Sequence, residues 1–277
     1  MNQPAHSAPA SPAPAEQPVL SFNNVSLDFG DTAVLENINF SLAPGETRIL
    51  LGPAGVGKSV LLKLANGLLR PTQGSVCLFG QEISHISEEQ LFALRTRTGM
   101  VFQEGALFDS LSVRDNVGYQ LVQEQVPDDE IDRRVREELH FVELEQTFDL
   151  FPDSLSGGMK RRVAIARTLI HQPELLLYDS PTGGLDPVTS TTIIELIIKQ
   201  RDVYHTPSLL VTHRLQDAFA LSTHRFDPAL GRMVPLPKGE TDLLTTYMML
   251  ADGRLIFDGS LHDLLHSQNE FVQNFME

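Results

Sequence analysis

Apolar and polar residues alternate along the first part of the chain in the manner of β-strands. The pattern predicts paired strands over Val19–Phe29 and Val34–Leu42, and a short buried strand over Thr47–Leu51. A glycine-rich turn follows that strand. The apolar spacing then changes to that of a helix over Lys58–Leu69.

Strands and helices alternate through much of the remaining chain. Ser112–His140 has a helical pattern and is strongly charged toward its end. The other predicted elements are strands Ser75–Phe79 and Gly99–Phe102, helix Gly157–Ile170, strand Glu174–Asp179, helix Pro187–Arg201, strand Ser208–Thr212 and helix Leu215–Ser222. Strands that alternate with helices of this length indicate a mostly parallel α/β sheet.

The two ends of the chain differ in composition from this body. Residues 1–18 are rich in Pro, Ala and Ser and contain no Lys or Arg, which predicts a disordered tail rather than a signal peptide. A Pro-rich arm that binds a partner is the alternative. Asp227–Thr246 is broken by Pro and Gly and is expected to be a surface insertion. Tyr247–Ala251 and Arg254–Phe257 are predicted to form a hairpin, followed by a helical tail over 266–277.

The composition narrows the kinds of partner that the chain can have. Its 277 residues include 21 Lys+Arg and 36 Asp+Glu, a formal net charge of −15. Phosphate backbones repel so acidic a chain, which argues against general nucleic-acid binding. No apolar run reaches the roughly 18–20 residues of a membrane-spanning helix. The single cysteine, Cys77, excludes an internal disulfide and fits a reducing cytoplasm.

The glycine-rich turn contains the most specific motif of the chain. Gly52-Pro53-Ala54-Gly55-Val56-Gly57-Lys58-Ser59 fits the pattern G-x-x-x-x-G-K-[ST] and stands between a predicted strand and a predicted helix. Glycines let the backbone N–H groups point at phosphate oxygens, and the helix N-terminus adds partial positive charge. Lys58 is expected to reach the β- and γ-phosphates of ATP, and the Ser59 hydroxyl to bind Mg²⁺.

A carboxylate ends one of the predicted strands, Leu175–Asp179. At the carboxyl end of a parallel strand beside a phosphate-binding turn, Asp179 can hold Mg²⁺ through its water shell. The alternative is an ordinary aspartate that caps a turn. The phosphate-binding motif in the same chain favours the metal role.

A second glycine pair lies in Leu155-Ser156-Gly157-Gly158-Met159, directly before a predicted helix. Ser156 suits the N-cap position, and the glycines leave backbone N–H groups free for an anion. Together with the phosphate turn, this stretch resembles the signature of ABC transporter ATPase subunits, and the resemblance extends from Val19 to Gly259. In that family the signature of one subunit closes over the nucleotide held by the other.

The resemblance implies roles for further positions. Phe29 is similar to the aromatic residue that stacks on adenine. Gln103 matches the glutamine that contacts Mg²⁺ and reports to the membrane subunit. Gly184-Leu185-Asp186 resembles the loop that crosses the dimer interface, where Asp186 also fits a helix N-cap. His213 matches the histidine that contacts the γ-phosphate.

The chain departs from the family pattern directly after Asp179. The family places glutamate there to position or polarise the attacking water, and this chain has Ser180. A hydroxyl is a poor base near neutral pH, so hydrolysis is expected to suffer while ATP binding and dimer closure are not. Four readings stay open: slow hydrolysis in a homodimer supported by His213, pairing with a different and competent ATPase subunit, substitution by a carboxylate such as Glu104, or one introduced or tolerated substitution.

Three further segments indicate a subfamily of these ATPases. The segments similar to the ATPases of MCE-type, or Mla-like, lipid transporters are Phe102–Phe108, Ser112–Val117 and Asn269–Phe275.

Many acidic residues lie in the segment from Glu124 to Asp149, which the resemblance places near the membrane subunit. That surface could dock basic cytoplasmic loops, and a solvated helical face explains it equally well.

The resemblance implies an α/β fold of the P-loop NTPase type, with a RecA-like core, an antiparallel β subdomain and an inserted helical subdomain. The cassette is expected over 19–265, with the helical subdomain at about 104–165 and an insertion at about 227–246. Expected partners are an identical or different ABC ATPase subunit, integral membrane permease subunits and an MCE-type lipid-binding protein, without nucleic acid.

The expected location is peripheral, at the cytoplasmic face of the inner membrane. Two alternatives remain for the function. One is an ATP-dependent clamp or regulatory protein that binds ATP but barely hydrolyses it. The other is a soluble ABC ATPase of translation or repair. The latter usually has two cassettes or a long coiled coil, which this chain does not show, and the acidic charge also disfavours it.

Overall fold

The computed structural model describes residues 17–277, so nearly all of the predicted tail lies outside the described residues. The strands are β1 (Leu20–Phe29), β2 (Thr32–Leu42), β3 (Thr47–Leu51), β4 (Gln73–Leu78), β5 (Gln81–Glu82), β6 (Thr98–Val101), β7 (Leu175–Asp179), β8 (Ser208–Val211), β9 (His224–Asp227), β10 (Arg232–Pro235), β11 (Thr245–Ala251) and β12 (Arg254–Gly259). The α-helices are α1 (Lys58–Ala65), α2 (Glu88–Arg95), α3 (Val113–Gln123), α4 (Asp128–Phe141), α5 (Gly157–Leu169), α6 (Pro187–Tyr204), α7 (Leu215–Thr223), α8 (Leu261–Leu265) and α9 (Glu270–Met276). Short 3₁₀ turns, η1 and η2, cover Glu145–Thr147 and Pro152–Ser154.

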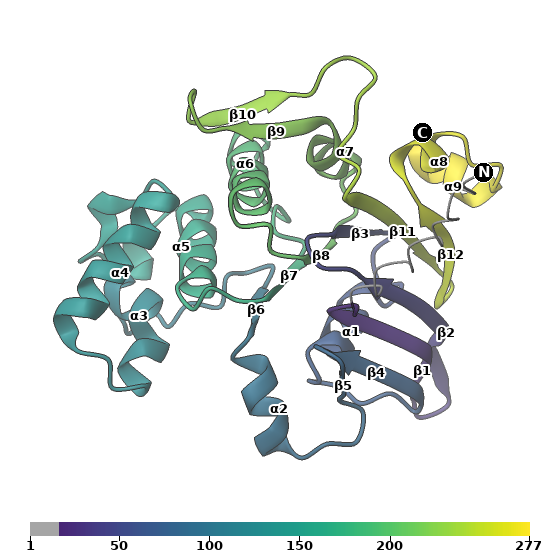
Figure 1. Ribbon diagram of the computed structural model, residues 1–277, viewed down its shortest axis with the longest axis horizontal. Helices are drawn as coiled ribbons and strands as arrows, with labels where there is room; N and C mark the ends of the chain where they lie inside the picture. Colours follow the sequence, from purple (N-terminus) through teal and green to yellow (C-terminus); the bar gives the residue numbers. More distant parts are fainter. Residues whose placement is uncertain (1–16) are drawn as a thin grey trace, which may run out of the picture.

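A six-stranded sheet in the order β12-β11-β3-β8-β7-β6 forms the centre of the fold (Figure 1). All neighbouring strands in it run parallel except β12, which pairs with β11 in the antiparallel direction. The mostly parallel α/β sheet is therefore confirmed, because helical crossovers bring successive strands back in the same direction.

A second sheet and a group of helices lie on different sides of this centre. The antiparallel sheet β2-β1-β4-β5 occupies the lower right of Figure 1, whereas α3 and α4 lie at the far left, next to α5. This is the predicted combination of a RecA-like core, an antiparallel β subdomain and inserted helices. None of the helices within residues 17–277 has both the length and the apolar content needed to cross a membrane.

Two hydrophobic clusters hold the layers together, one on each face of the central sheet. In β3, Ile49 and Leu51 pack toward the cluster shared with helices α3 to α7, whereas Leu50 packs toward the cluster shared with α1 and the antiparallel sheet. In β7, Tyr178 and Leu177 divide in the same way. Alternate residues of these strands therefore enter opposite layers, which explains why both strands are apolar throughout.

Several predicted elements differ from the structure for local reasons. The helix predicted to Leu69 ends at Ala65, since Gly67 adopts a left-handed conformation with φ of +64°. The stretch Ser112–His140 is two helices, separated where Gln125 has φ of +60°. Helix α2 was not predicted, although Ser87 and Gln90 form a capping box at its start.

The C-terminal third contains more regular structure than expected. The segment predicted as a broken insertion over 227–246 includes β10, which pairs with β9, and the pair lies over α6 (Figure 1). Carboxylates on α6 accept hydrogen bonds from two outward-facing amides of this pair, Asp202 from Phe226 N at 2.7 Å and Glu195 from Met233 N at 2.5 Å. The terminal hairpin of β11 and β12 is confirmed, and β11 also joins the central sheet beside β3.

Candidate nucleotide-binding site

The loops that follow four parallel strands enclose a cleft of about 360 Å³. Because β3, β6, β7 and β8 run in the same direction, their carboxyl ends meet at one edge of the sheet. The predicted site residues that line the cleft are Ala54, Gly55, Gly57, Lys58, Ser59, Gln103, Ser180 and His213. Val34 of β2 and Val60 of α1 line it as well, and no sequence motif had singled them out.

Two glycines allow the phosphate turn to pass close to neighbouring backbone. Gly52 has φ of +148°, and a Cβ there would lie 2.4 Å from the carbonyl oxygen of Leu250 in β11. Gly57 has φ of +104°, and a Cβ there would lie 3.1 Å from Leu35 in β2. Both positions therefore require glycine, for its backbone conformation and for its missing side chain. Pro53 and Val56 belong to the same turn.

The Lys58 ammonium folds back over the turn and organises it. Its Nζ atom donates hydrogen bonds to the carbonyl oxygens of Gly52, at 2.8 Å, and of Pro53, at 2.6 Å. Burial lowers the pKa of Lys58, and the charge of Asp179 partly opposes that shift. The cation is thus held inside the turn, where phosphate groups would complete its coordination.

The residues predicted to bind magnesium are adjacent. The Ser59 hydroxyl donates a 3.0 Å hydrogen bond to Oδ1 of Asp179, although the two residues are separated by 120 positions in the chain. Hydroxyl and carboxylate oxygens are the donors that Mg²⁺ accepts beside phosphates. The residues present therefore fit the predicted magnesium nucleotide, and Lys58, Ser59 and Asp179 are the ones that would hold it.

Ser180 is fixed by backbone contacts at the cleft. Its φ is +47°, an uncommon conformation for a residue other than glycine. Its N–H donates to the Val211 carbonyl at 2.9 Å, and its carbonyl accepts from the Gly183 N–H at 2.8 Å. Both hydrogen bonds use only backbone atoms of residue 180, so a different residue at this position should keep the same backbone conformation.

Two buried or half-buried arginines connect the site loops and were missed by sequence reasoning. Arg161 of α5 donates to the carbonyl oxygens of Pro181, at 2.9 Å, and Ser180, at 3.3 Å. Arg214, next to His213, donates to Ser190 Oγ at 2.8 Å and approaches Asp217 at 3.4 Å. Neither arginine belongs to a motif, and only the fold brings each one to its partners.

The signature stretch lies apart from the cleft but beside the predicted dimer loop. Ser156 caps α5 by accepting a hydrogen bond from the Met159 N–H, as predicted. A Cβ on Gly157 would lie 3.8 Å from Leu185, and one on Gly158 would lie 2.2 Å from Thr189. Leu155 is buried, whereas Ser156 and Gly157 are exposed. The chain does not bring its own signature to its own phosphate turn.

Asp186 is the N-cap of α6, as the sequence predicted. Its Oδ1 atom accepts hydrogen bonds from the Val188 and Thr189 N–H groups, both at 3.0 Å, and Pro187 occupies the first helical position. The hydrogen bond from the Thr189 hydroxyl is the main reason that the pKa of Asp186 is lowered. The loop Gly184-Leu185-Asp186 is thereby anchored at its end.

Phe29 lies at the end of β1 with 52% of its side chain exposed, outside the lining of the cleft. Phe29 pairs with Thr32 of β2, two residues before the cleft-lining Val34, and an exposed aromatic ring there is consistent with stacking on a base. We predict that Phe29→Ala weakens ATP binding about 10-fold, the usual effect of losing a base-stacking ring. Equilibrium titration with Mg-ATP measures this, and Phe92→Ala, an exposed phenylalanine on α2, is the control. Equal affinities of the two variants would contradict the stacking role.

Comparison with known proteins identifies the family. Residues 35–183 match the sequence family described as ABC transporter. The chain belongs to the ABC transporter family. This confirms the resemblance inferred from the motifs, and the protein is an ATP-binding ATPase subunit of this family. The matched region includes the phosphate turn, Gln103, the signature and Asp179.

The similar proteins differ in how much of their length the ABC cassette spans. The intermembrane phospholipid transport system ATP-binding protein MlaF of Haemophilus influenzae is 31% identical over 94% of this chain and 91% of that protein. Protein TRIGALACTOSYLDIACYLGLYCEROL 3, chloroplastic, of Arabidopsis thaliana is 37% identical over 93% and 73%. The methionine import ATP-binding protein MetN 2 of Bacillus cereus is 42% identical, but over only 71% of this chain and 59% of that protein.

Solved structures of ABC cassettes have the same fold. CbiO1 of Clostridium perfringens, part of an ABC transporter complex, has a TM-score of 0.76 and 28% identity, with 94% of each chain covered. The cassette MJ0796, in a dimeric post-hydrolysis state bound to ADP and Pi, has a TM-score of 0.73 and 27% identity, covering 87% of this chain and 98% of that one. ABC cassettes of this kind work as dimers in transporters.

Proposed function

We propose that this ABC cassette powers the transport of phospholipid, or of a chemically related lipid, between membranes. The observation that carries the proposal is the nearly full-length similarity to MlaF, whereas the similarity to the methionine importer stops at 59% of that protein. The second long match is a chloroplast protein whose name refers to a galactolipid. An integral membrane permease and an MCE-type lipid-binding protein are the proposed partners, at the cytoplasmic face of the inner membrane.

In this proposal the cleft holds Mg-ATP. Lys58 and the N-terminus of α1 bind the phosphates, Ser59, Gln103 and Asp179 surround the metal, and His213 contacts the γ-phosphate. The hydrogen bond from Ser59 to Asp179 supports the metal assignment, because it brings two magnesium-type donors together beside Lys58. ATP supplies the free energy when two cassettes close around it.

The proposed dimer is head-to-tail, so the signature of one subunit completes the site of the other. Two features support this arrangement. Ser156 and Gly157 are exposed and lie outside the subunit's own cleft. A Cβ on Gly157 would lie 3.8 Å from Leu185, so the signature is close to the predicted dimer loop. A second ABC subunit, identical or different, would bury both segments.

The proposed transport is tested with the complex purified through the tagged full-length chain. We expect it to contain a membrane permease and, after reconstitution into vesicles, to move a fluorescent phospholipid in a manner that requires Mg-ATP. The same complex with Lys58→Met, which removes the phosphate-binding cation, is the matched control. ATP-driven uptake of methionine or ferric iron, without lipid movement, would contradict the proposal.

One observation favours a second candidate function, an ATP-dependent clamp that closes but hardly hydrolyses ATP. Ser180 lines the cleft together with Lys58 and His213, at the position where the resemblance to the family predicts glutamate. A clamp would move no lipid in repeated cycles, yet would still close in the presence of Mg-ATP. Steady-state ATPase measured with the membrane partner present separates the two functions.

A further inference from the structure

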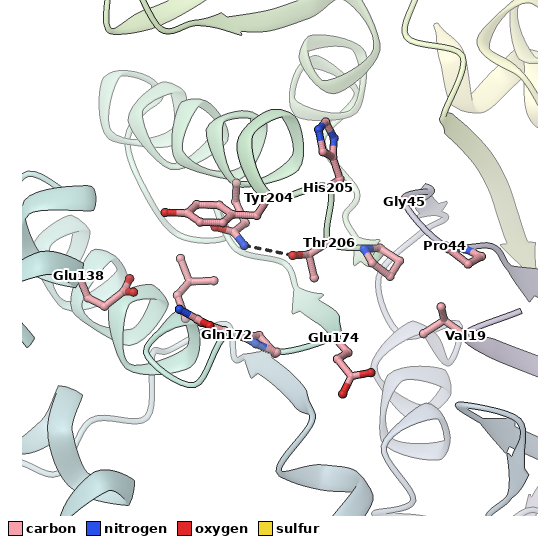
Figure 2. Close-up of a pocket in the computed structure, with 13 residues that line it drawn as sticks. Val19, Pro44, Gly45, Glu138, Gln172, Glu174, Tyr204, His205 and Thr206 are labelled. Carbon is pink, nitrogen blue, oxygen red and sulfur yellow. Dashed lines mark hydrogen bonds between the residues drawn. The ribbon is translucent and has the colours of Figure 1, made fainter. Parts of the chain in front are cut away.

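Helix α6 has a cavity at each end. The cavity at its C-terminal end, about 510 Å³ in volume, is lined by Tyr204 and Thr206 and lies where β3, β7 and β8 begin, away from the nucleotide cleft (Figure 2). A smaller cavity of about 360 Å³ lies at the start of α6, directly after the dimer loop. Its lining includes Ser190, Arg214 and Asp217. Because Arg214 follows His213 in the chain, this second cavity adjoins the nucleotide site as well.

The guanidinium group of Arg214 spans the distance from the turn after β8 to the dimer loop. Its Nη1 atom donates to Ser190 Oγ at 2.8 Å, and to the carbonyl oxygens of Thr182 at 3.3 Å and Leu185 at 3.5 Å. A guanidinium group has five N–H donors in one fixed plane, so one arginine can serve several acceptors. The Thr182 carbonyl lies before the dimer loop and the Leu185 carbonyl lies in it. Arg214 therefore holds the loop at two points.

Asp217 connects Arg214 to the same loop by a second route. It is buried, accepts a hydrogen bond from the Thr182 hydroxyl, and lies 3.4 Å from Nε of Arg214. A buried carboxylate requires a counter-charge, because burial removes the water that would solvate it. Neutralising Asp217 is thus one function of Arg214, and a test of any other function has to keep that charge balanced.

The turn that carries His213 and Arg214 is held on both sides of the histidine. The Arg214 N–H donates to Thr212 Oγ1 at 3.0 Å, and the Thr212 N–H donates to the Leu50 carbonyl of β3 at 3.2 Å. Thr212 is buried, whereas His213 is exposed and lines the cleft. A ligand that fixes His213 therefore also restricts the backbone from which the Arg214 side chain extends.

The tip of the dimer loop has little support of its own. Gly184 and Asp186 are exposed, and a Cβ on Gly184 would meet no atom within 4 Å. Arg161 holds the segment just before the loop through the Pro181 carbonyl, at 2.9 Å. Exposed loops of this kind open locally more readily than buried strands. The position of the loop therefore depends on the groups that anchor its ends, and Arg214 is one of them.

We infer that Arg214 is a positioning residue that transmits the state of His213 to the dimer loop, so that the loop is held more firmly when a γ-phosphate occupies the cleft. The inference rests on the proposed contact between His213 and the γ-phosphate. It adds a residue outside the sequence motifs. Because coupling between two sites is reciprocal, burying the dimer loop against a second subunit should in turn strengthen the binding of ATP over ADP.

The test compares amide hydrogen exchange in the full-length protein saturated with Mg-ADP and with the magnesium complex of AMP-PNP, an ATP analogue that keeps the γ-phosphate and resists hydrolysis. The protein is kept at a concentration at which light scattering shows a monomer, so that no dimer interface protects the loop. We expect the peptide covering residues 182–186 to exchange about 10-fold more slowly with AMP-PNP, the effect of holding hydrogen bonds to a charged group.

Arg214→Lys is the decisive variant, because it keeps a positive charge beside Asp217 and loses the planar fork that bridges two carbonyl oxygens. The exchange difference between the two nucleotides should fall below about 2-fold in this variant. The double variant Arg214→Met, Asp217→Asn removes both charges together, so that no buried charge is left without a partner, and should lose the difference as well. Arg232→Lys, at an exposed arginine of β10, is the matched control and should keep it.

Three outcomes would overturn the inference. They are equal exchange with the two nucleotides in the parent protein, a difference that persists in both Arg214 variants, and a loss that occurs in Arg232→Lys as well. A merely structural function of Arg214 has its own signature. The loop of Arg214→Lys would then exchange faster by the same factor with both nucleotides, and the difference between them would remain, which also contradicts the inference.

His213→Ala separates the inference from the proposed function on which it rests. Equilibrium titration of this variant should show a smaller preference for AMP-PNP over ADP, and an unchanged preference would contradict the proposed contact with the γ-phosphate. Transmission is measured separately, by exchange at saturating nucleotide. There the difference in residues 182–186 should fall below about 2-fold in His213→Ala. A difference that persists would show that the signal does not pass through His213 and would overturn the inference.

Discussion

Ser180→Glu is expected to raise the steady-state ATPase rate at least about 100-fold, the usual contribution of a positioned general base. Ser180 lines the cleft together with Lys58 and His213, so we expect a carboxylate there to orient the water that attacks a nucleotide bound in the cleft. The hydroxyl of serine is a poor base near neutral pH. Phosphate release at saturating Mg-ATP, with the membrane partner present and absent, measures the effect.

The backbone geometry at residue 180 allows the ATPase rates of the parent protein and its variants to be compared directly. Because Val211 and Gly183 hold the Ser180 backbone by hydrogen bonds, exchanging the side chain leaves the loop in place. Ser180→Gln is the matched control, since glutamine has the size of glutamate without its basicity, and it should leave the rate near that of the parent. Similar rates for the parent and Ser180→Glu would contradict the prediction. In that case Glu104→Gln would test whether Glu104 acts as the base.

Lys58→Met is expected to weaken Mg-ATP binding about 10- to 100-fold, the effect of losing hydrogen bonds to charged phosphates. The Lys58 ammonium is held inside the phosphate turn by the Gly52 and Pro53 carbonyls, so phosphate reaches a cation that is already oriented. The charge of the whole chain is −15 and repels ATP, which makes the local cation more important.

Calorimetric titration with Mg-ATP measures this loss. Lys63→Met is the control, because Lys63 is on the same helix α1 but exposed, away from the cleft. It should bind ATP with affinity within about 2-fold of the parent. Equal affinity of Lys58→Met and Lys63→Met would show that backbone N–H groups alone bind the phosphates.

Local patterns allowed much of the nucleotide site to be predicted. The phosphate turn is contiguous, and the glycine conformations at Gly52 and Gly57 depend on a few neighbouring residues. The caps at Ser156 and Asp186 are likewise hydrogen bonds to amides two or three residues away. Secondary structure was predicted less well where the chain changes direction, as at Gln125, although Pro127 and the acidic residues after it mark the start of α4.

Contacts between distant residues could not be predicted in this way. Arg161 and Arg214 have ordinary positions in their helix and loop, and their function as clamps appears only when other loops are placed beside them. The same is true of β11, which looked like half of a hairpin and also pairs with β3. Strand order depends on packing across the whole sheet.

The amino-acid sequence by itself determined the family and predicted the nucleotide and the departure at Ser180, because those depend on residue types in short, ordered motifs. Only the tertiary structure decided that Ser59 and Asp179 meet and that the signature lies away from its own cleft. It also decided which charged groups meet, as where Arg161 of α5 donates to the Pro181 carbonyl and Arg214 approaches Asp217. Whether a charge is paired depends on every element packed around it, and those elements come from all parts of the chain.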